Sequence, residues 1–63
     1  MTVGERVRAW RVANAYGVRH LARLADLDEV TLRRIEDGTR QPRIGTIRKL
    51  AAAMGLWPEE LQA

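Results

Sequence analysis

The sequence contains no cysteine, which excludes disulfide bonds and thiolate metal sites as supports for a fold. This absence is compatible with a reducing compartment. The longest stretch without a polar side chain runs only from Leu50 to Trp57, whereas a helix needs about 20 residues to span a bilayer. The N-terminus has no basic segment followed by an apolar run, so no signal peptide is predicted. We therefore expect a cytoplasmic protein with no membrane partner.

Residue combinations that are typical of enzymes are also missing. There is no cysteine nucleophile, no glycine-rich phosphate loop and no histidine–carboxylate constellation. The single histidine, His20, has no second histidine or cysteine near it, so its spacing indicates a solvated residue rather than a metal ligand. We expect no enzymatic activity, no catalytic residue, no cofactor, no metal and no small-molecule ligand.

Positive charge is concentrated just after the middle of the chain. The net charge is +3 over 63 residues, and residues 33–49 hold six basic side chains against two acidic ones. Such a patch is typical of nucleic-acid binding. The alternative is a solvated face in an arginine-rich proteome, since ten of the eleven basic residues are arginines. The length itself predicts one small domain over residues 1–63.

Apolar residues recur at helical spacing throughout, and no segment alternates as a strand does. Thr2 and Glu5 have capping-box spacing, Asp28 suits an N-cap, and Gly38 and Gly55 suit helix ends. Asn14, a residue that tolerates left-handed geometry, is expected to end the first helix. The sequence predicts an all-α fold with helices over residues 3–13, 18–25, 29–37 and 44–54, and a short fifth helix from residue 58.

The expected core comes from the apolar side of each helix. Leu32 and Ile35 form a buried pair in the third helix, and Leu27 in the preceding turn points inward. Trp10 is expected to be a core residue rather than part of a ligand site. Leu61 should also face inward, from the last helix.

The ordered set of these residues resembles the helix-turn-helix domain of phage Cro and repressor proteins, the XRE-type regulators. The resemblance covers about residues 3–61 and depends on the order of the set rather than on any one member. Its members are Val7, Trp10, Arg11, Leu21, Ala22, Ala25, Leu27, Leu32, Ile35, Glu36, Gly38, Pro42, Thr46, Leu50, Ala51, Met54 and Gly55.

The resemblance implies a lambda-repressor-like bundle of four helices plus a short C-terminal fifth, with its helix-turn-helix core at residues 18–38. It implies sequence-specific binding of double-stranded DNA by a transcriptional regulator, with a repressor as the expected type and the third helix in the major groove. It also implies an ion pair between Arg11 and Glu36, and a bacterial or phage-derived protein that is nucleoid-associated when bound.

Family positions supply the expected site residues. Base contacts are expected from Glu29, Val30, Thr31, Arg33 and Arg34. Phosphate contacts are expected from Val18, Arg19, Thr39, Arg40 and Arg43. For Glu29 an alternative stays open, namely a carboxylate that only favours the N-terminal end of the helix. The family usually acts as a homodimer on a palindromic site, for which the candidate contacts are Leu56, Trp57 and Leu61.

The chain departs from the family pattern at four positions. Val18 replaces a common glutamine, Asp26 and Ala15 replace common glycines, and Arg43 replaces a helix-capping serine or threonine. The missing glutamine removes a usual DNA contact. Together with the acidic residues around the third helix, it leaves a second hypothesis open: a helix-turn-helix fold that serves as a protein-interaction module without reading DNA.

Overall fold

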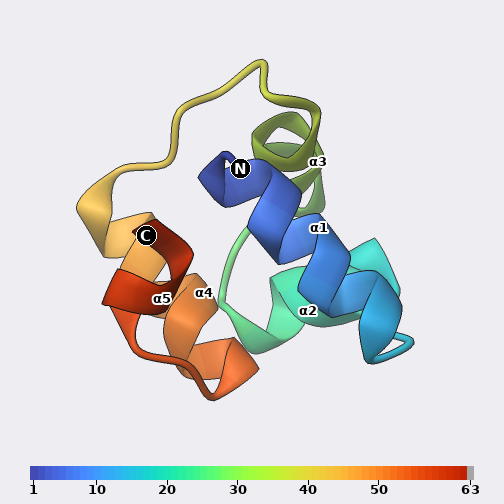
Figure 1. Ribbon diagram of the computed structural model, residues 1–63. Coiled ribbons are helices and arrows are strands. Elements are labelled where there is room, and N and C mark those ends of the chain that lie inside the picture. The colour runs from blue at the N-terminus through green and yellow to red at the C-terminus, as the bar shows by residue number, and fades with distance from the viewer. Residues whose placement is uncertain (63) are drawn as a thin grey trace.

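The computed structural model describes residues 1–62, which form α-helices and no strands, as predicted (Figure 1). The helices are α1 (Val3–Ala13), α2 (Val18–Leu24), α3 (Glu29–Asp37), α4 (Ile44–Met54) and α5 (Pro58–Gln62). The predicted bounds of α1, α3 and α4 are confirmed, and α2 ends one residue earlier than expected, with Ala25 as its C-cap. No helix within residues 1–62 is long and apolar enough to cross a membrane.

Local capping chemistry explains where the helices begin and end. The Thr2 hydroxyl accepts from the Glu5 amide at 3.1 Å, and the Glu5 carboxylate accepts from the Thr2 amide at 2.8 Å. This reciprocal pair is the predicted capping box. Asp28 accepts from two amides in the first turn of α3. Gly38 (φ 80°) and Gly55 (φ 70°) end α3 and α4 in the left-handed conformation that glycine adopts without steric cost.

The two connections around α2 place non-glycine residues in the left-handed region. Asp26 has φ 55°, as its replacement of a family glycine implies. Asn14 ends α1 as its C-cap, as predicted, with φ −101°, which lies outside the left-handed region. That conformation falls one residue later, on Ala15 with φ 58°. The Asn14 side chain donates back to the Trp10 carbonyl at 2.8 Å.

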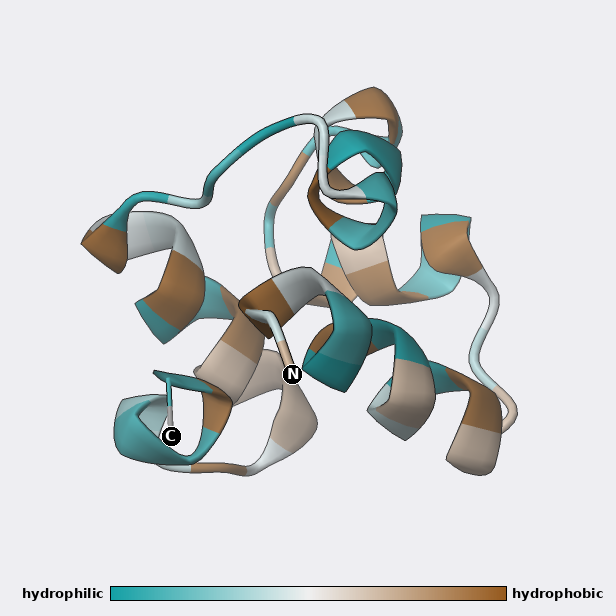
Figure 2. Cartoon of the chain, turned by 45° about the horizontal axis from the view of Figure 1, so that its top comes forward, coloured by the Kyte–Doolittle hydropathy of each residue, from teal (hydrophilic) through white to brown (hydrophobic). Residues whose placement is uncertain are grey.

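One hydrophobic core joins all five helices. Helix α3 packs against α1 and α2, and α5 packs against α4 and α1. In Figure 2 hydrophobic and hydrophilic stretches alternate along the helices, whereas the segment between α3 and α4 is mostly hydrophilic. The predicted anchors Leu32, Ile35 and Leu61 are at most 2% exposed. The buried apolar set is Val7, Leu21, Ala22, Ala25, Leu32, Ile35, Ile47, Leu50, Ala51, Met54 and Leu61.

Helices α1 and α3 approach each other closely at Gly4, which is buried in the first turn of α1. A Cβ atom at this position would overlap the Ile35 carbonyl oxygen and lie 2.9 Å from the Ile35 carbonyl carbon. Both atoms belong to the backbone of α3, which cannot rotate away as a side chain can. Gly4 therefore sets how close α1 lies to α3, the helix that carries the candidate reading face.

Candidate nucleic-acid interface

The turn between α2 and α3 is tightly bonded, and it fixes how α3 is presented. The Leu27 amide donates to the Ala22 carbonyl at 2.8 Å, and the Leu27 side chain packs against the core, as predicted. Lys49 of α4 donates to the Asp26 carbonyl at 3.4 Å and lies 3.7 Å from its carboxylate. These contacts connect the turn to α2 and to α4.

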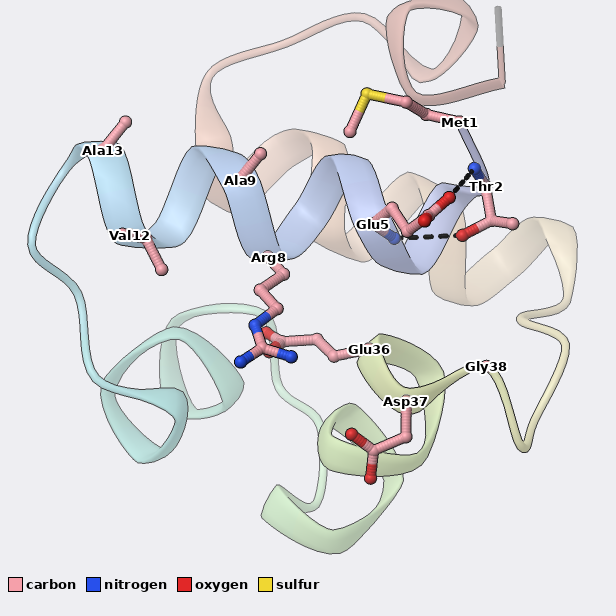
Figure 3. Close-up of a pocket in the computed structure, with 10 residues that line it drawn as sticks. All are labelled: Met1, Thr2, Glu5, Arg8, Ala9, Val12, Ala13, Glu36, Asp37 and Gly38. Carbon is pink, nitrogen blue, oxygen red and sulfur yellow. Dashed lines mark hydrogen bonds between the residues drawn. The ribbon is translucent and has the colours of Figure 1, made fainter.

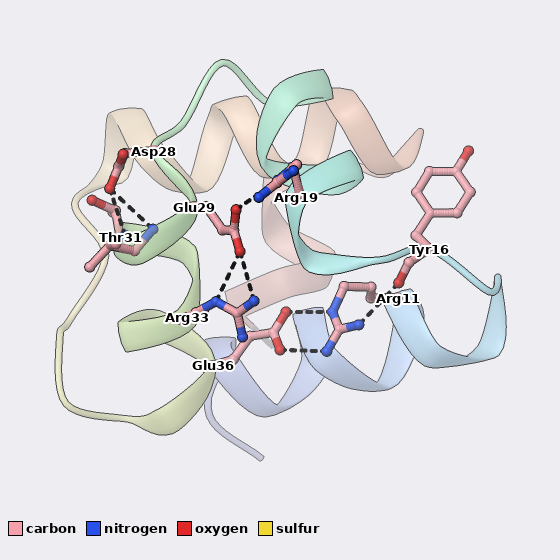
Figure 4. Close-up of polar contacts among 9 residues, drawn as sticks. Arg11, Tyr16, Arg19, Asp28, Glu29, Thr31, Arg33 and Glu36 are labelled. Atoms are coloured by element: carbon pink, nitrogen blue, oxygen red, sulfur yellow. Dashed lines mark hydrogen bonds and ion pairs between the residues drawn. The ribbon is translucent and has the colours of Figure 1, made fainter.

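The outer side of α3 carries most of the expected base-contact residues. Val30 is 51% exposed, the Arg33 side chain is 58% exposed, and Arg34 is also exposed. Thr31 is half-buried beside the Asp28 cap (Figure 4). Because Leu32 and Ile35 occupy the inner side, this outer face is free to enter a groove.

Glu29 is bonded within the protein through both of its carboxylate oxygens. Its Oε1 accepts from Arg19 Nε at 3.1 Å, and its Oε2 accepts from Arg33 Nε at 3.1 Å and Arg33 Nη2 at 2.7 Å (Figure 4). Glu29 thus joins two arginines, one from α2 and one from α3. Hydrogen bonds from Arg33 and then Arg19 hold the pKa of the Glu29 carboxyl below its usual range.

The expected phosphate-binding residues differ in how free they are. Both donors of Thr39 are used, since its amide and hydroxyl donate to the Arg34 carbonyl at 3.0 and 3.3 Å. Val18 packs against the core, which leaves its backbone amide as the group that would meet a phosphate. Arg40 and Arg43 are exposed, and Arg43 caps α4 without a side-chain hydrogen bond.

The basic patch separates into bonded and unbonded members. Arg33 pairs with Glu29, and Lys49 lies beside Asp26. Within residues 1–62, no ion pair involves Arg34, Arg40 or Arg43. These three arginines lie on α3 and on the segment that follows it. All three are exposed, so their positive charges are available at the surface.

The predicted ion pair between Arg11 and Glu36 is present and connects α1 to α3. Arg11 Nε and Nη2 donate to the two Glu36 oxygens at 2.8 and 2.9 Å, and Nη1 donates to the Tyr16 carbonyl at 3.0 Å (Figure 4). The side chains are only 15% and 5% exposed. The hydrogen bond with Glu36 raises the pKa of the Arg11 guanidinium. The pair thus joins the inner side of α3 to α1, whereas Glu29 bonds to arginines of α2 and α3.

One expected dimer contact is contradicted by burial. Leu61 is 1% exposed because it packs in the core of its own chain, so it has no surface to offer a second copy. Leu56 is half-buried against the core. Trp57 is 72% exposed and is the most accessible aromatic side chain in the described part of the protein.

Aromatic side chains gather at the connection between α1 and α2. Tyr16 contacts Trp10 edge-on, with ring centroids 5.2 Å apart, and stacks on His20 at 4.7 Å. Trp10 is half-buried against the core, as expected. His20 is exposed, as expected, but its ring is covered on one face by Tyr16. The group closes the end of the core next to the Arg11–Tyr16 hydrogen bond.

A broad depression of about 890 Å³ lies between α1 and the C-terminal end of α3 (Figure 3). Its lining includes Met1, Val12, Asp37 and the capping-box residues Thr2 and Glu5. Thr2 and Glu5 bind each other, so their polar atoms are already satisfied. The depression is separate from the outer face of α3 that carries Val30 and Arg33.

Sequence reasoning missed several structural features in and around this interface. The spacing of Glu29 and Arg33, four residues apart on one helix, is a usable signal for an ion pair. An isolated glycine inside a helical pattern, such as Gly4, is a signal for close packing. The contact of Lys49 with Asp26 has no local signal, because it joins segments 23 residues apart.

The chain was compared with known proteins. A family model described as a helix-turn-helix domain matches residues 2–63. The solved structure of the restriction-modification controller protein C.AhdI from Aeromonas hydrophila is similar with a TM-score of 0.89 and 36% identity, covering 94% of this chain and 89% of that one. The structure of SinR, a master regulator for biofilm formation solved in complex with DNA, is similar with a TM-score of 0.91 and 24% identity, covering 98% of this chain and 100% of that one.

A search of curated proteins gave no match. The family match covers nearly the whole chain, and the sequence identity to C.AhdI is 36%. Both agree with the order of helices and with the capped α2–turn–α3 unit described above. The chain belongs to the helix-turn-helix domain family, in agreement with its resemblance to the Cro and repressor type.

Proposed function

We propose that the protein is a transcriptional regulator that binds double-stranded DNA sequence-specifically, with α3 in the major groove. The observation that carries the proposal is the outer face of α3, where Val30 and Arg34 are exposed on a helix fixed from its inner side by Arg11 and Glu36. An arginine can bind guanine through two donors, and a valine can contact a thymine methyl group. The similarity to C.AhdI, a controller protein, supports the assignment.

Sequence-independent contacts would come from the exposed arginines after α3. Arg40 and Arg43 are free of ion pairs within residues 1–62 and suit phosphate binding. Thr39 would have to give up its bond to the Arg34 carbonyl to contribute. Such a protein would act in the cytoplasm, on the nucleoid when bound, and residues 1–63 would function as a single domain.

The proposal includes a homodimer on a palindromic site. A single α3 would read only one half-site. A two-fold symmetric dimer would place its two α3 helices in successive turns of the major groove. Trp57 is the candidate contact because its side chain is largely exposed beside the half-buried Leu56.

Selection of bound sequences from random duplex DNA tests the proposal. We expect an enriched palindrome, and an affinity that falls steeply as salt rises because phosphate contacts release counterions. An absence of enrichment, together with weak salt dependence, would instead favour the second hypothesis. In that case the acidic Asp28, Glu29 and Asp37 around α3 would belong to a surface that binds protein.

A further inference from the structure

The carboxylate of Glu29 is placed where it controls two of the arginines expected to meet DNA. Its side chain is 28% exposed, whereas those of Arg19 and Arg33 are 77% and 58% exposed. The acid is therefore the most covered member of the group, with one oxygen bound to α2 and the other to α3. An exposed carboxylate that only favoured a helix terminus would not need both of these partners.

The hydrogen-bond pattern constrains Arg33 in a specific way. Glu29 Oε2 takes the edge of the guanidinium formed by Nε and Nη2. The other edge, formed by Nη1 and Nη2, keeps hydrogens available for two parallel bonds. Because an i,i+4 contact on one helix is short, Arg33 is held along the face of α3 instead of extending freely toward any nearby phosphate.

The same contact lowers the effective charge of the surface. Arg19 and Arg33 carry two positive charges, and Glu29 lies within 3.1 Å of both. Sequence-independent binding depends on how many basic groups replace counterions along the DNA. Paired arginines contribute less to this attraction than Arg34, Arg40 and Arg43, which have no ion pair within residues 1–62.

We propose that Glu29 is a specificity-determining residue that positions Arg33 for base reading and restrains Arg19 and Arg33 from indiscriminate phosphate binding. The inference rests on the proposed DNA-binding function and assigns Glu29 a role inside the protein, in place of a direct contact with cytosine. Loss of the Glu29 carboxylate should therefore strengthen binding to unrelated duplex DNA and lower the ratio of specific to unrelated affinity.

The test compares Glu29→Gln with Asp37→Asn. Both substitutions remove one negative charge from α3, but Asp37 is exposed and belongs to no ion pair within residues 1–62. Affinity for the selected site and for an unrelated duplex is measured at several salt concentrations. For Glu29→Gln on unrelated duplex, we expect the slope of log affinity against log salt to steepen by about 0.9 for each released arginine.

We also expect the ratio of specific to unrelated affinity to fall about tenfold for Glu29→Gln, within the range that a well-placed bidentate contact supplies. Asp37→Asn should leave both the slope and the ratio near the wild-type values. Equal changes in the two variants would show a plain charge effect and overturn the inference, while the proposed function would stand. A wild-type protein that does not distinguish the selected site would overturn the proposed function itself.

Glu29→Ala provides a second variant, because glutamine can still accept one hydrogen bond from arginine. It should move the salt slope at least as far as Glu29→Gln does. A thermal melt of each variant checks that it is folded, which is expected because Glu29 lies at the surface and outside the apolar core.

Discussion

At the scale of single residues, the most restrictive position is Gly4. Its Cα faces the backbone of Ile35, so even a methyl group cannot be accommodated without moving α1 away from α3. Gly4→Ala should lower the free energy of unfolding by about 3 kcal/mol, near the upper end for overpacked sites. Chemical denaturation of the two proteins measures the difference.

Gly45 provides the matched control for that substitution. It lies in the first turn of α4, no atom lies within 4 Å of a Cβ built there, and its φ is not positive. Gly45→Ala should leave stability unchanged or raise it by up to about 1 kcal/mol, because alanine loses less backbone entropy in a helix. Equal losses for the two variants would contradict the close approach at Gly4.

Arg34 is an expected base-contact residue that has no ion pair within residues 1–62, whereas Arg33 is bound to Glu29. Arg34→Ala should cost about 1–3 kcal/mol of binding free energy on the selected site. The loss should be smaller on unrelated duplex, where arginine meets only phosphate. Fluorescence anisotropy with both duplexes measures the two losses, and equal values would assign Arg34 to phosphate binding instead.

At the scale of helices, the Arg11–Glu36 pair connects α1 to α3. Glu36→Ala leaves the Arg11 guanidinium largely covered and without its charged partner. Breaking such a pair typically costs about 3–5 kcal/mol, and the remaining bond to the Tyr16 carbonyl places this case near the lower end. Denaturation of Glu36→Ala beside Asp37→Ala checks this. Asp37→Ala, at the exposed neighbouring position, should change the free energy of unfolding by no more than about 0.5 kcal/mol.

The pair between α2 and α3 makes a different contribution, which depends on pH. Glu29 has a lowered pKa in the folded protein, so the unfolded chain takes up its proton first as pH falls. The stabilisation is therefore present above the ordinary glutamate pKa of about 4.3 and is lost as pH falls through the lower folded value. At pH 7 the melting temperature of the wild type should exceed that of Glu29→Gln, and the gap between the two melting temperatures should narrow toward pH 3.

Calorimetry at both pH values measures this gap. The pKa of Glu5 is also lowered, by hydrogen bonds from the Thr2 amide and hydroxyl, but both proteins contain Glu5 and its effect cancels. The gap at pH 7 should also shrink in 1 M salt, because exposed ion pairs are screened. A gap that is independent of pH and salt would mean that the Glu29 ion pairs add nothing to stability.

Helix boundaries were predictable from the sequence because their signals are local. The capping box at Thr2, the Asp28 cap and the terminal glycines each act within about four residues. The inner face of α3 was predictable for the same reason, from the spacing of Leu32 and Ile35. The Arg19–Glu29 bond was not predicted, because it depends on the angle at which α2 meets α3. The family resemblance supplied Arg11–Glu36, which no local pattern indicates.

Burial limits what a sequence pattern can say about surfaces. Leu61 and Trp57 are both large and apolar, yet the first lies in the core and the second in solvent. The difference arises because Leu61 lies on the side of the short helix α5 that faces the core. Trp57 precedes that helix and lies outside it, next to Pro58. The sequence could therefore place candidate dimer contacts only in a region, and burial removes Leu61 from the candidates.

At the scale of the whole molecule, the proposed homodimer depends on Trp57. A two-fold interface uses each contact residue twice, so one substitution removes two side chains. If each central tryptophan contributes about 2 kcal/mol, Trp57→Ser should raise the dimer dissociation constant roughly a thousandfold. Sedimentation velocity over a range of protein concentrations measures this shift.

Leu24→Ser is the control for that experiment, because Leu24 is another exposed large apolar residue but lies on a different helix, α2. It should leave the association unchanged. Trp57→Ser should keep its melting temperature at concentrations where both proteins are monomeric, since the side chain is 72% exposed. It should also bind an isolated half-site as wild type does, while losing the added affinity of the palindrome. Unaltered association of Trp57→Ser would move the two-fold contact elsewhere on the molecule.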